Sequence, residues 1–396
     1  MQGELQQLFH QVEELVNDGR LAEAEQALTE LAALARTRQD PLAEGVALGD
    51  LASVQAELGS HSAAWQNWPN AAAVLIGLPG GEWELARSVY WPMARHARGC
   101  NQAEAAHWAY QQATAVLEQL APSSEEFSLH LAGLLADWAQ WHCEIAQGEQ
   151  AEALYGRALA ALAAFHQPSV RLRDSQARLL DGHADILKNL GRLEESAAQW
   201  RSARRIFEEI GCTEGVVASL VSLARALWSG GDVDESRRAA SDAAERAEEA
   251  AGARPAVRGE AFENQGRFLL AEGRDIEADT YFQLAEILYR RQVEEDDPDQ
   301  WIVPLQQVVA QRATLLIQRH DLRAAAVTVE ELIAFWRPYL DADPERRMPA
   351  YLMPVHRLTK LYQALGETEK AGALVAQIRH LRVNLAANRT ASLTPA

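Results

Sequence analysis

The stretch AQGEQAEALYGRALA, residues 146–160, joins a turn signal to the start of an amphipathic helix. Ala151, Tyr155 and Ala158 follow one another at positions i, i+4 and i+7, which share one face of an α-helix. The small residue lets two helix backbones approach closely, and the aromatic residue fills the gap toward a neighbouring helix. The stretch therefore predicts the second helix of a helical hairpin.

The same pattern recurs along the chain after turn signals such as NLGRLEESA at 189 and AEGRDIEAD at 271. We call each set a trio: a small residue, a bulky or apolar residue four positions later and an apolar residue seven positions later. Alanine, leucine, glutamate, glutamine and arginine dominate the composition, so the predicted fold class is all-α. The nine trios are Ala24/Leu28/Leu31, Ala64/Trp68/Ala71, Ala106/Tyr110/Ala113, Ala151/Tyr155/Ala158, Ser196/Trp200/Ala203, Ser236/Ala240/Ala243, Ala278/Phe282/Ala285, Ala325/Val329/Leu332 and Ala371/Val375/Ile378.

This pattern, with Gly-Arg or Gly-Asp in the preceding turn, resembles the tetratricopeptide repeat (TPR) over roughly residues 4–382. Successive trios advance by 40 to 47 residues instead of about 34. The chain thus resembles the long-repeat members found in bacterial regulatory and adaptor proteins. The resemblance implies one right-handed superhelical solenoid of about nine helix pairs, residues 1–383, whose first helices line a concave groove. The tail, residues 384–396, is expected to be disordered.

The formal net charge of −19 is spread along most of the chain, which disfavours nucleic acid and anionic membranes as partners. The first residues, MQGELQQLFHQVEELV, lack the basic and apolar regions of a signal peptide. Three cysteines without a metal-binding spacing indicate reduced, mostly buried thiols. A cytoplasmic location is expected.

No motif of catalysis or nucleotide binding occurs: GxxxxGK[ST], GxGxxG, HExxH and GxSxG are all absent. His96 could approach His107, and His130 could approach His142, across helices. Neither pair has a defined carboxylate or thiolate partner, so no metal site is expected. We predict no catalytic residue, no cofactor and no enzymatic activity.

The dipeptide Trp-Pro occurs twice within helical sequence, at Pro69 and Pro92. Proline inside a helix removes one hydrogen bond and clashes with the preceding turn, at a cost of about 3 kcal/mol, so at least one kink is expected. Pro69 could instead lie in the first turn of a helix capped by Asn67. Seven of the eleven tryptophans fall within residues 65–141, where they either fill gaps between splayed helices or line a pocket for a partner.

Aligning the first helices on the trios predicts which side chains face the groove. Trp91, Arg95 and Arg98 put one aromatic and two guanidinium groups on a single face, so the groove is expected to be basic there and mixed beyond it. An acidic or C-terminal peptide end could dock at the two arginines. The same register selects Asp181, Asp185, Lys188, Arg225, Trp228, Glu263, Arg267, His356 and Lys360.

Three hypotheses for function follow. The first is a non-catalytic scaffold or adaptor that binds a protein or peptide segment in the groove. The second is a regulatory receptor for a small signalling peptide, although relatives of that kind usually carry an N-terminal effector bundle and the first repeat here begins by about residue 4. The third, a non-catalytic subunit of a larger enzyme complex, has the same sequence features as the first.

Overall fold

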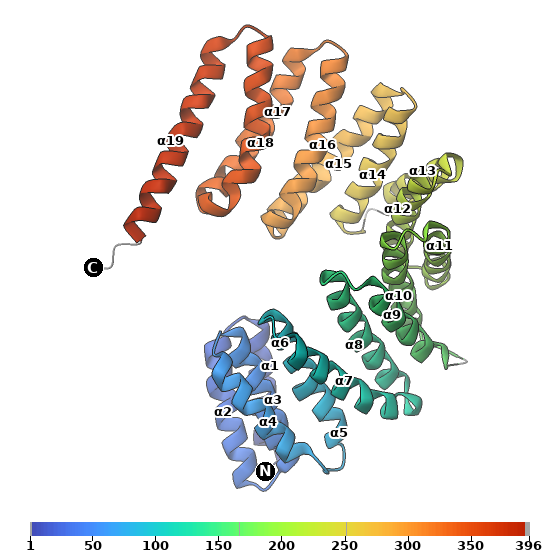
Figure 1. The fold of residues 1–396 in the computed structure, drawn as a ribbon, viewed down its shortest axis with the longest axis vertical. Coiled ribbons are helices and arrows are strands. Elements are labelled where there is room, and N and C mark those ends of the chain that lie inside the picture. The colour runs from blue at the N-terminus through green and yellow to red at the C-terminus, as the bar shows by residue number, and fades with distance from the viewer. Residues whose placement is uncertain (1, 166, 251, 393–396) are drawn as a thin grey trace. The chain divides into compact units, whose positions relative to one another are not determined.

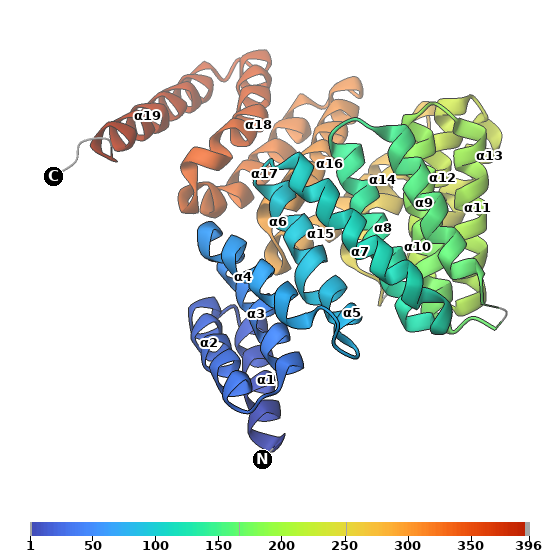
Figure 2. The same cartoon turned by 60° about the horizontal axis from the view of Figure 1, so that its bottom comes forward.

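The computed structural model describes residues 2–165, 167–250 and 252–392, and within them the secondary structure is helical, without a strand. Contacts divide the chain into two compact units, the N-terminal unit (Met1–Gln199) and the C-terminal unit (Trp200–Ala396). Within each unit, consecutive helices pack side by side in chain order (Figure 1 and Figure 2). The predicted all-α fold of TPR-like helix pairs is confirmed. None of the described helices combines the length and the apolar character needed to cross a bilayer.

The N-terminal unit holds the first hairpins. A short 3₁₀ turn, η2 (Ala121–Ser123), separates its third and fourth hairpins. The pairs are α1 (Gln2–Asn17) with α2 (Leu21–Thr37), α3 (Pro41–Glu57) with α4 (His61–Leu75), the composite helix α5 (Gly81–Glu84), η1 (Leu85–Tyr90) and α6 (Trp91–Gly99) with α7 (Ala103–Leu120), α8 (Glu125–Glu144) with α9 (Gly148–Ala163), and α10 (Val170–Asn189) with the start of α11 (Leu193–Ile210).

The C-terminal unit begins within α11 and continues with four further hairpins. These are α12 (Thr213–Gly230) with α13 (Val233–Glu249), α14 (Pro255–Ala271) with α15 (Asp275–Glu295), α16 (Pro298–Gln318) with α17 (Leu322–Ala342), and α18 (Pro344–Ala364) with α19 (Thr368–Ser392).

All nine trios lie on the second helices of these pairs, as predicted. Every trio residue is buried except Val375, whose side chain is 44% exposed. Val375 belongs to α19, the last helix described, and no later helix covers it. Ala64, Ala106 and Ala278 are fully buried, as close packing of helix backbones requires.

Two trios begin with serine instead of alanine, and the hydroxyl groups show why serine is accepted there. Ser196 Oγ donates a hydrogen bond to the Ala184 carbonyl at 2.6 Å, and Ser236 Oγ donates to the Ala224 carbonyl at 2.5 Å. Each acceptor lies on the first helix of the same hairpin. The buried hydroxyl is therefore satisfied, and it ties the two helices together.

The C-terminal helix bears on one expectation. Helix α19 continues to Ser392, so the tail expected to be disordered from residue 384 overlaps its last turns. Residues 393–396 lie outside the described residues, and disorder of the tail stays a prediction.

Candidate functional site

A pocket of about 1030 Å³ lies on the N-terminal unit, between the first helices of three successive hairpins. Its lining comes from α3, from η1 and α6, and from α8, with further contributions from α4. Three of the residues selected from the sequence, Trp91, Arg95 and Arg98, line it together. First helices therefore supply the pocket, as the repeat register predicts.

Asp137, on α8, organises the floor of this pocket. Its Oδ2 accepts hydrogen bonds from Trp91 Nε1 at 2.8 Å and from the Tyr110 hydroxyl at 3.0 Å. Its Oδ1 accepts from Arg98 Nη1 at 3.4 Å. Burial and the Asp137 charge raise the pKa of Tyr110, so the phenol remains a donor. We call these four residues the Asp137 cluster.

The two arginines differ in how strongly the protein holds them. Arg98 also donates from Nε to Glu144 Oε2 at 3.1 Å and makes a second bond from Nη2 to the same carboxylate. The side chain of Arg95 is 70% exposed, and its Nε lies 4.0 Å from Asp137 Oδ2. Arg95 thus presents its guanidinium group to solvent, whereas Arg98 is held by two carboxylates.

The expectation of a basic groove at this point is wrong. Three arginines line the pocket, at positions 87, 95 and 98, and three carboxylates accompany them, from Glu57, Asp137 and Glu144. Asp137 and Glu144 of α8 were not predicted from the sequence as lining residues. Each lies one residue after the position that the trio alignment selects. The lining is consequently balanced in charge.

The proline at position 92 is accommodated by a π-helical turn. Residues Leu85–Tyr90 form η1, in which the Trp91 N–H donates to the Ala86 carbonyl five residues back. The hydrogen-bond pattern thus changes just before Pro92, and the expected kink stays a prediction. A Cβ on Gly49 of α3 would lie 2.7 Å from the Ser88 carbonyl oxygen, so only glycine allows α3 to pack this closely against the π turn.

The first Trp-Pro pair has a different outcome. Pro69 lies inside the continuous helix α4, so the alternative in which Asn67 caps a new helix is wrong. Instead, Asn67 Nδ2 donates to Gln55 Oε1 of α3 at 2.8 Å.

The tryptophans divide between the two roles left open by the sequence. Trp68, Trp138 and Trp141 are buried in the hydrophobic cores of the unit. Trp91 lines the pocket and is partly buried, while Trp108 is 46% exposed. Interior packing therefore accounts for much of the tryptophan cluster, and Trp91 supplies the aromatic wall.

A second pocket, of about 440 Å³, extends the same face toward the N-terminus. It lies against α1 and α3 and shares Ser53, Glu57 and Arg87 with the larger pocket. Asp50 also lines it, and burial raises the pKa of that carboxyl to about 6, against the opposing charge of Arg87. The two pockets thus form one lined surface from α1 to α8.

A histidine and cysteine cluster borders the larger pocket. The ligand-type atoms of His61, His96 and Cys100 lie within 4.8 Å of one another, and Cys100 Sγ is 3.6 Å from His96 Nε2. The expectation that His96 has no thiol partner is therefore wrong, because Cys100 lies one helical turn from it. Packing of α4 against α6 adds His61, which is 35 positions earlier in the chain. The three cysteines are free and half-buried, not mostly buried as expected.

The other histidines have different neighbours from those expected. The ring of His107 lies 5.2 Å from that of His142, and the ring of His130 lies 4.5 Å from that of Trp83. His142 Nδ1 is 2.6 Å from Gln147 Oε1. The two expected pairs, His96 with His107 and His130 with His142, are thus replaced by contacts of these histidines with other side chains.

The C-terminal unit carries a smaller pocket, of about 270 Å³, between the first helices α12 and α14. Arg225, Trp228 and Arg267, all selected from the sequence, line it. Trp228 is 47% exposed and stands edge-on to Phe268, with ring centroids 5.1 Å apart. Asn264 also lines this pocket, and its buried Nδ2 has no hydrogen-bond partner.

Glu263 does not face this pocket as expected; it is buried beneath it and is only 4% exposed. Its carboxylate accepts a hydrogen bond from the Tyr289 hydroxyl of α15 at 3.0 Å and another from Arg267 Nη2. Tyr289 of α15 and Arg267 of α14 thus stabilise the buried charge of Glu263. We call these three residues the Glu263 cluster.

The remaining predicted residues lie elsewhere. On α10, Lys188 Nζ donates to Asp185 Oδ1 at 2.8 Å, and Asp181 is half-buried one turn away. On α18, His356 and Lys360 are exposed one turn apart. A binding role for any of the twelve residues stays a prediction.

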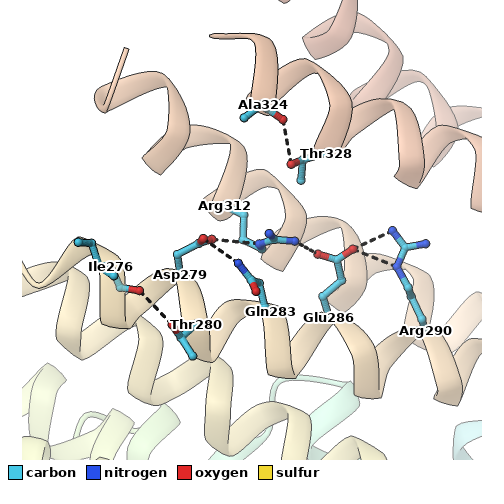
Figure 3. Close-up of polar contacts among 9 residues, drawn as sticks. All are labelled: Ile276, Asp279, Thr280, Gln283, Glu286, Arg290, Arg312, Ala324 and Thr328. Carbon is cyan, nitrogen blue, oxygen red and sulfur yellow. Dashed lines mark hydrogen bonds and ion pairs between the residues drawn. The ribbon is translucent and has the colours of Figure 1, made fainter. Parts of the chain in front are cut away.

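A buried ion-pair network in the C-terminal unit escaped sequence reasoning (Figure 3). Arg312 of α16 donates to Asp279 Oδ1 at 3.1 Å and to Glu286, both on α15. Arg290 donates to the same Glu286 at 2.7 Å. Burial alone would lower the pKa of Arg312, but the two carboxylates raise it. The network joins the second helix of one hairpin to the first helix of the next, and we assign it to packing.

No family model and no curated protein match this sequence. Solved structures resemble the fold. The apo form of RapI is 11% identical and has a TM-score of 0.53, with 94% of this chain and 98% of that chain covered. BtubC (BKLC) from P. vanneervenii is 16% identical, with a TM-score of 0.50 and 59% and 90% covered.

A third similar structure is a signal transduction ATPase with numerous domains from Pyrococcus horikoshii, which has a tetratricopeptide repeat sensor. It is 12% identical, with a TM-score of 0.51, and the match covers 91% of this chain and 52% of that one. These likenesses show that the fold is of the TPR type, and at such identities they concern the fold alone.

Proposed function

We propose that the chain is a non-catalytic scaffold or adaptor that binds an extended peptide or protein segment along the first helices of its N-terminal unit. The observation that carries this proposal is the lined surface from α1 to α8, where two pockets share Ser53, Glu57 and Arg87. An extended segment fits a surface built from successive first helices better than a compact ligand does.

The lining has the chemistry of a peptide-binding surface. Phe9, Val12 and Val16 of α1 provide apolar contacts at one end, and Trp91 provides an aromatic wall at the other. Arg95 is the guanidinium group most open to solvent, so it would meet an acidic side chain or a terminal carboxylate of the partner. Because carboxylates also line the surface, the bound segment would carry charges of both signs.

A partner captured from the native cytosol, and then a peptide from its binding segment, would test the proposal. Titration of that peptide should show binding at least about tenfold weaker to Arg95→Ala than to the unchanged chain. Arg323→Ala is the matched control, since Arg323 is also strongly exposed and lies on α17 of the C-terminal unit. Equal affinity of the peptide for all three proteins would remove the proposed groove.

A receptor for a small signalling peptide is the second candidate, and the TPR sensor of the Pyrococcus horikoshii protein is what supports it. A receptor would change its radius of gyration when the peptide binds, whereas a rigid adaptor would keep it. Small-angle X-ray scattering with and without the peptide separates the two. A non-catalytic subunit of an enzyme complex would bind through the same surface as the adaptor.

A further inference from the structure

Three side chains with metal-binding atoms meet at the edge of the larger pocket, and the groove proposal does not use them. His61 is the first residue of α4, His96 lies in the last turn of α6, and Cys100 caps that helix. Their ligand-type atoms lie within 4.8 Å of one another. Among the described residues, this is the group of three or more such side chains that comes this close.

The distances suit tetrahedral coordination. With a Zn–S bond of about 2.3 Å and a Zn–N bond of about 2.0–2.1 Å, the sulfur and nitrogen of two ligands stand about 3.6 Å apart. Cys100 Sγ and His96 Nε2 are 3.6 Å apart. The His61 side chain is exposed, and its ligand-type nitrogen lies within 4.8 Å of both.

Local structure places these residues on one face. His96 and Cys100 are four positions apart, which is one helical turn. The π-helical turn at 85–90 accommodates an extra residue, so the residues beyond it are rotated by roughly 100° relative to an unbroken α-helix. This rotation sets the face that α6 presents to α4.

The rings and the helix end also favour a cation. The His96 ring packs 5.3 Å from the Trp68 ring and 5.7 Å from the Trp65 ring, which restricts its orientation. The C-terminus of α6 directs the negative end of its dipole toward Cys100.

The neighbouring charges do not oppose a metal ion. Arg98 is held by Asp137 and Glu144, and Glu57 lines the same pocket. Arg87 pairs with Glu84, and the side chain of Arg95 extends into solvent.

We infer that His61, His96 and Cys100 bind one divalent ion of the zinc type, with a fourth position open toward the pocket for water. Two imidazoles and one thiolate suit zinc, and three protein ligands with one open position fit its tetrahedral geometry. The bound ion would join α4 to α6, and so the second hairpin to the third. This inference does not depend on peptide binding.

The test uses the full chain freed of metal with a chelator. Titration with Zn²⁺ should give one equivalent bound, and titration with Co²⁺ should give the charge-transfer absorption of a cobalt thiolate. His96→Gln should bind Zn²⁺ at least about tenfold more weakly. Cys100→Ser should lose the charge-transfer band.

Two matched controls exist in the chain. His107→Gln alters a histidine that also lies beside another histidine, and Cys212→Ser alters another half-buried thiol. Both should keep the affinity and the band. Absence of the band in the unchanged chain, or its survival in Cys100→Ser, would overturn the inference. Equal circular dichroism spectra show that a variant is folded.

Discussion

The Asp137 cluster and the Glu263 cluster are built from the same parts but connect the fold differently. In each, a carboxylate on a first helix accepts hydrogen bonds from a tyrosine of a second helix and from an arginine. Asp137 takes its donors from α6 and α7, which belong to the preceding hairpin. Glu263 takes its donors from α14 and α15, which form its own hairpin.

This difference explains what each site offers a partner. A carboxylate that joins neighbouring hairpins fixes the walls of the pocket between them, so the larger pocket is held open by defined contacts. A carboxylate satisfied within one hairpin makes no such connection to a neighbouring hairpin. Across the smaller pocket of the C-terminal unit, α12 and α14 are instead connected by the contact of Trp228 with Phe268 and by Arg225, which lies 3.9 Å from Glu260.

Asp137→Ala should have the largest effect. It leaves the Tyr110 hydroxyl and the Trp91 N–H without an acceptor and removes a partner of Arg98. We expect a loss of about 3 kcal/mol in the free energy of unfolding, measured by urea denaturation. Amide exchange should increase in both α6 and α8, because the contact joins two hairpins.

Asp185→Ala is the control for that variant. Asp185 is exposed and contacts Lys188 on its own helix, so its loss should change the free energy of unfolding by less than about 0.5 kcal/mol. If the two alanine variants lose the same stability, Asp137 does not organise the pocket.

Removing one hydroxyl from each cluster sharpens the comparison. Tyr289→Phe should lower the free energy of unfolding by about 2 kcal/mol, since Glu263 is almost fully buried and keeps only Arg267 as a donor. Tyr110→Phe should lower the free energy of unfolding by about 1 kcal/mol, because Asp137 keeps Trp91 and Arg98 as donors. Urea denaturation of the two phenylalanine variants measures both. The reverse order would show that the number of remaining donors does not set the cost.

The sequence predicts the fold because the trios are local patterns. Spacing of i, i+4 and i+7 fixes one helix face whatever the rest of the chain does, and Ala24 and Phe282 lie buried on such a face. Val375 departs from the pattern because burial also needs a following helix, which a trio does not encode.

The site was predicted only in part. The register brought Trp91, Arg95 and Arg98 to one pocket, but it missed Asp137, which lies about 100° around the helix from the aligned face. The register also placed Glu263 in the groove. Periodicity along one helix does not show that a hydrogen-bond donor on another helix, such as Tyr289, contacts the side chain. The approach of His61 to Cys100 depends on the packing of two hairpins, and no local pattern contains it.

A third carboxyl, that of Asp50 on α3, extends the comparison. Here burial raises the pKa by more than the neighbouring Arg87 and Ser88 lower it. Burial raises the pKa of Asp50 to about 6, above the value of about 3.9 expected in the unfolded chain. The folded state therefore binds the proton more tightly than the unfolded state does. This contribution to stability is complete below about pH 4 and is lost as the pH rises through 6.

Asp50→Asn should consequently stabilise the chain at neutral pH, by about 1–2 kcal/mol at pH 7.5 and by little at pH 4. Urea denaturation of the variant and of the unchanged chain at a series of pH values gives this difference directly. Glu13→Gln is a suitable control, because Glu13 lines the same pocket but is exposed. A difference between Asp50→Asn and the unchanged chain that stays constant across the series would mean that the pKa of Asp50 is not raised, and that burial of its carboxyl does not outweigh the charge of Arg87.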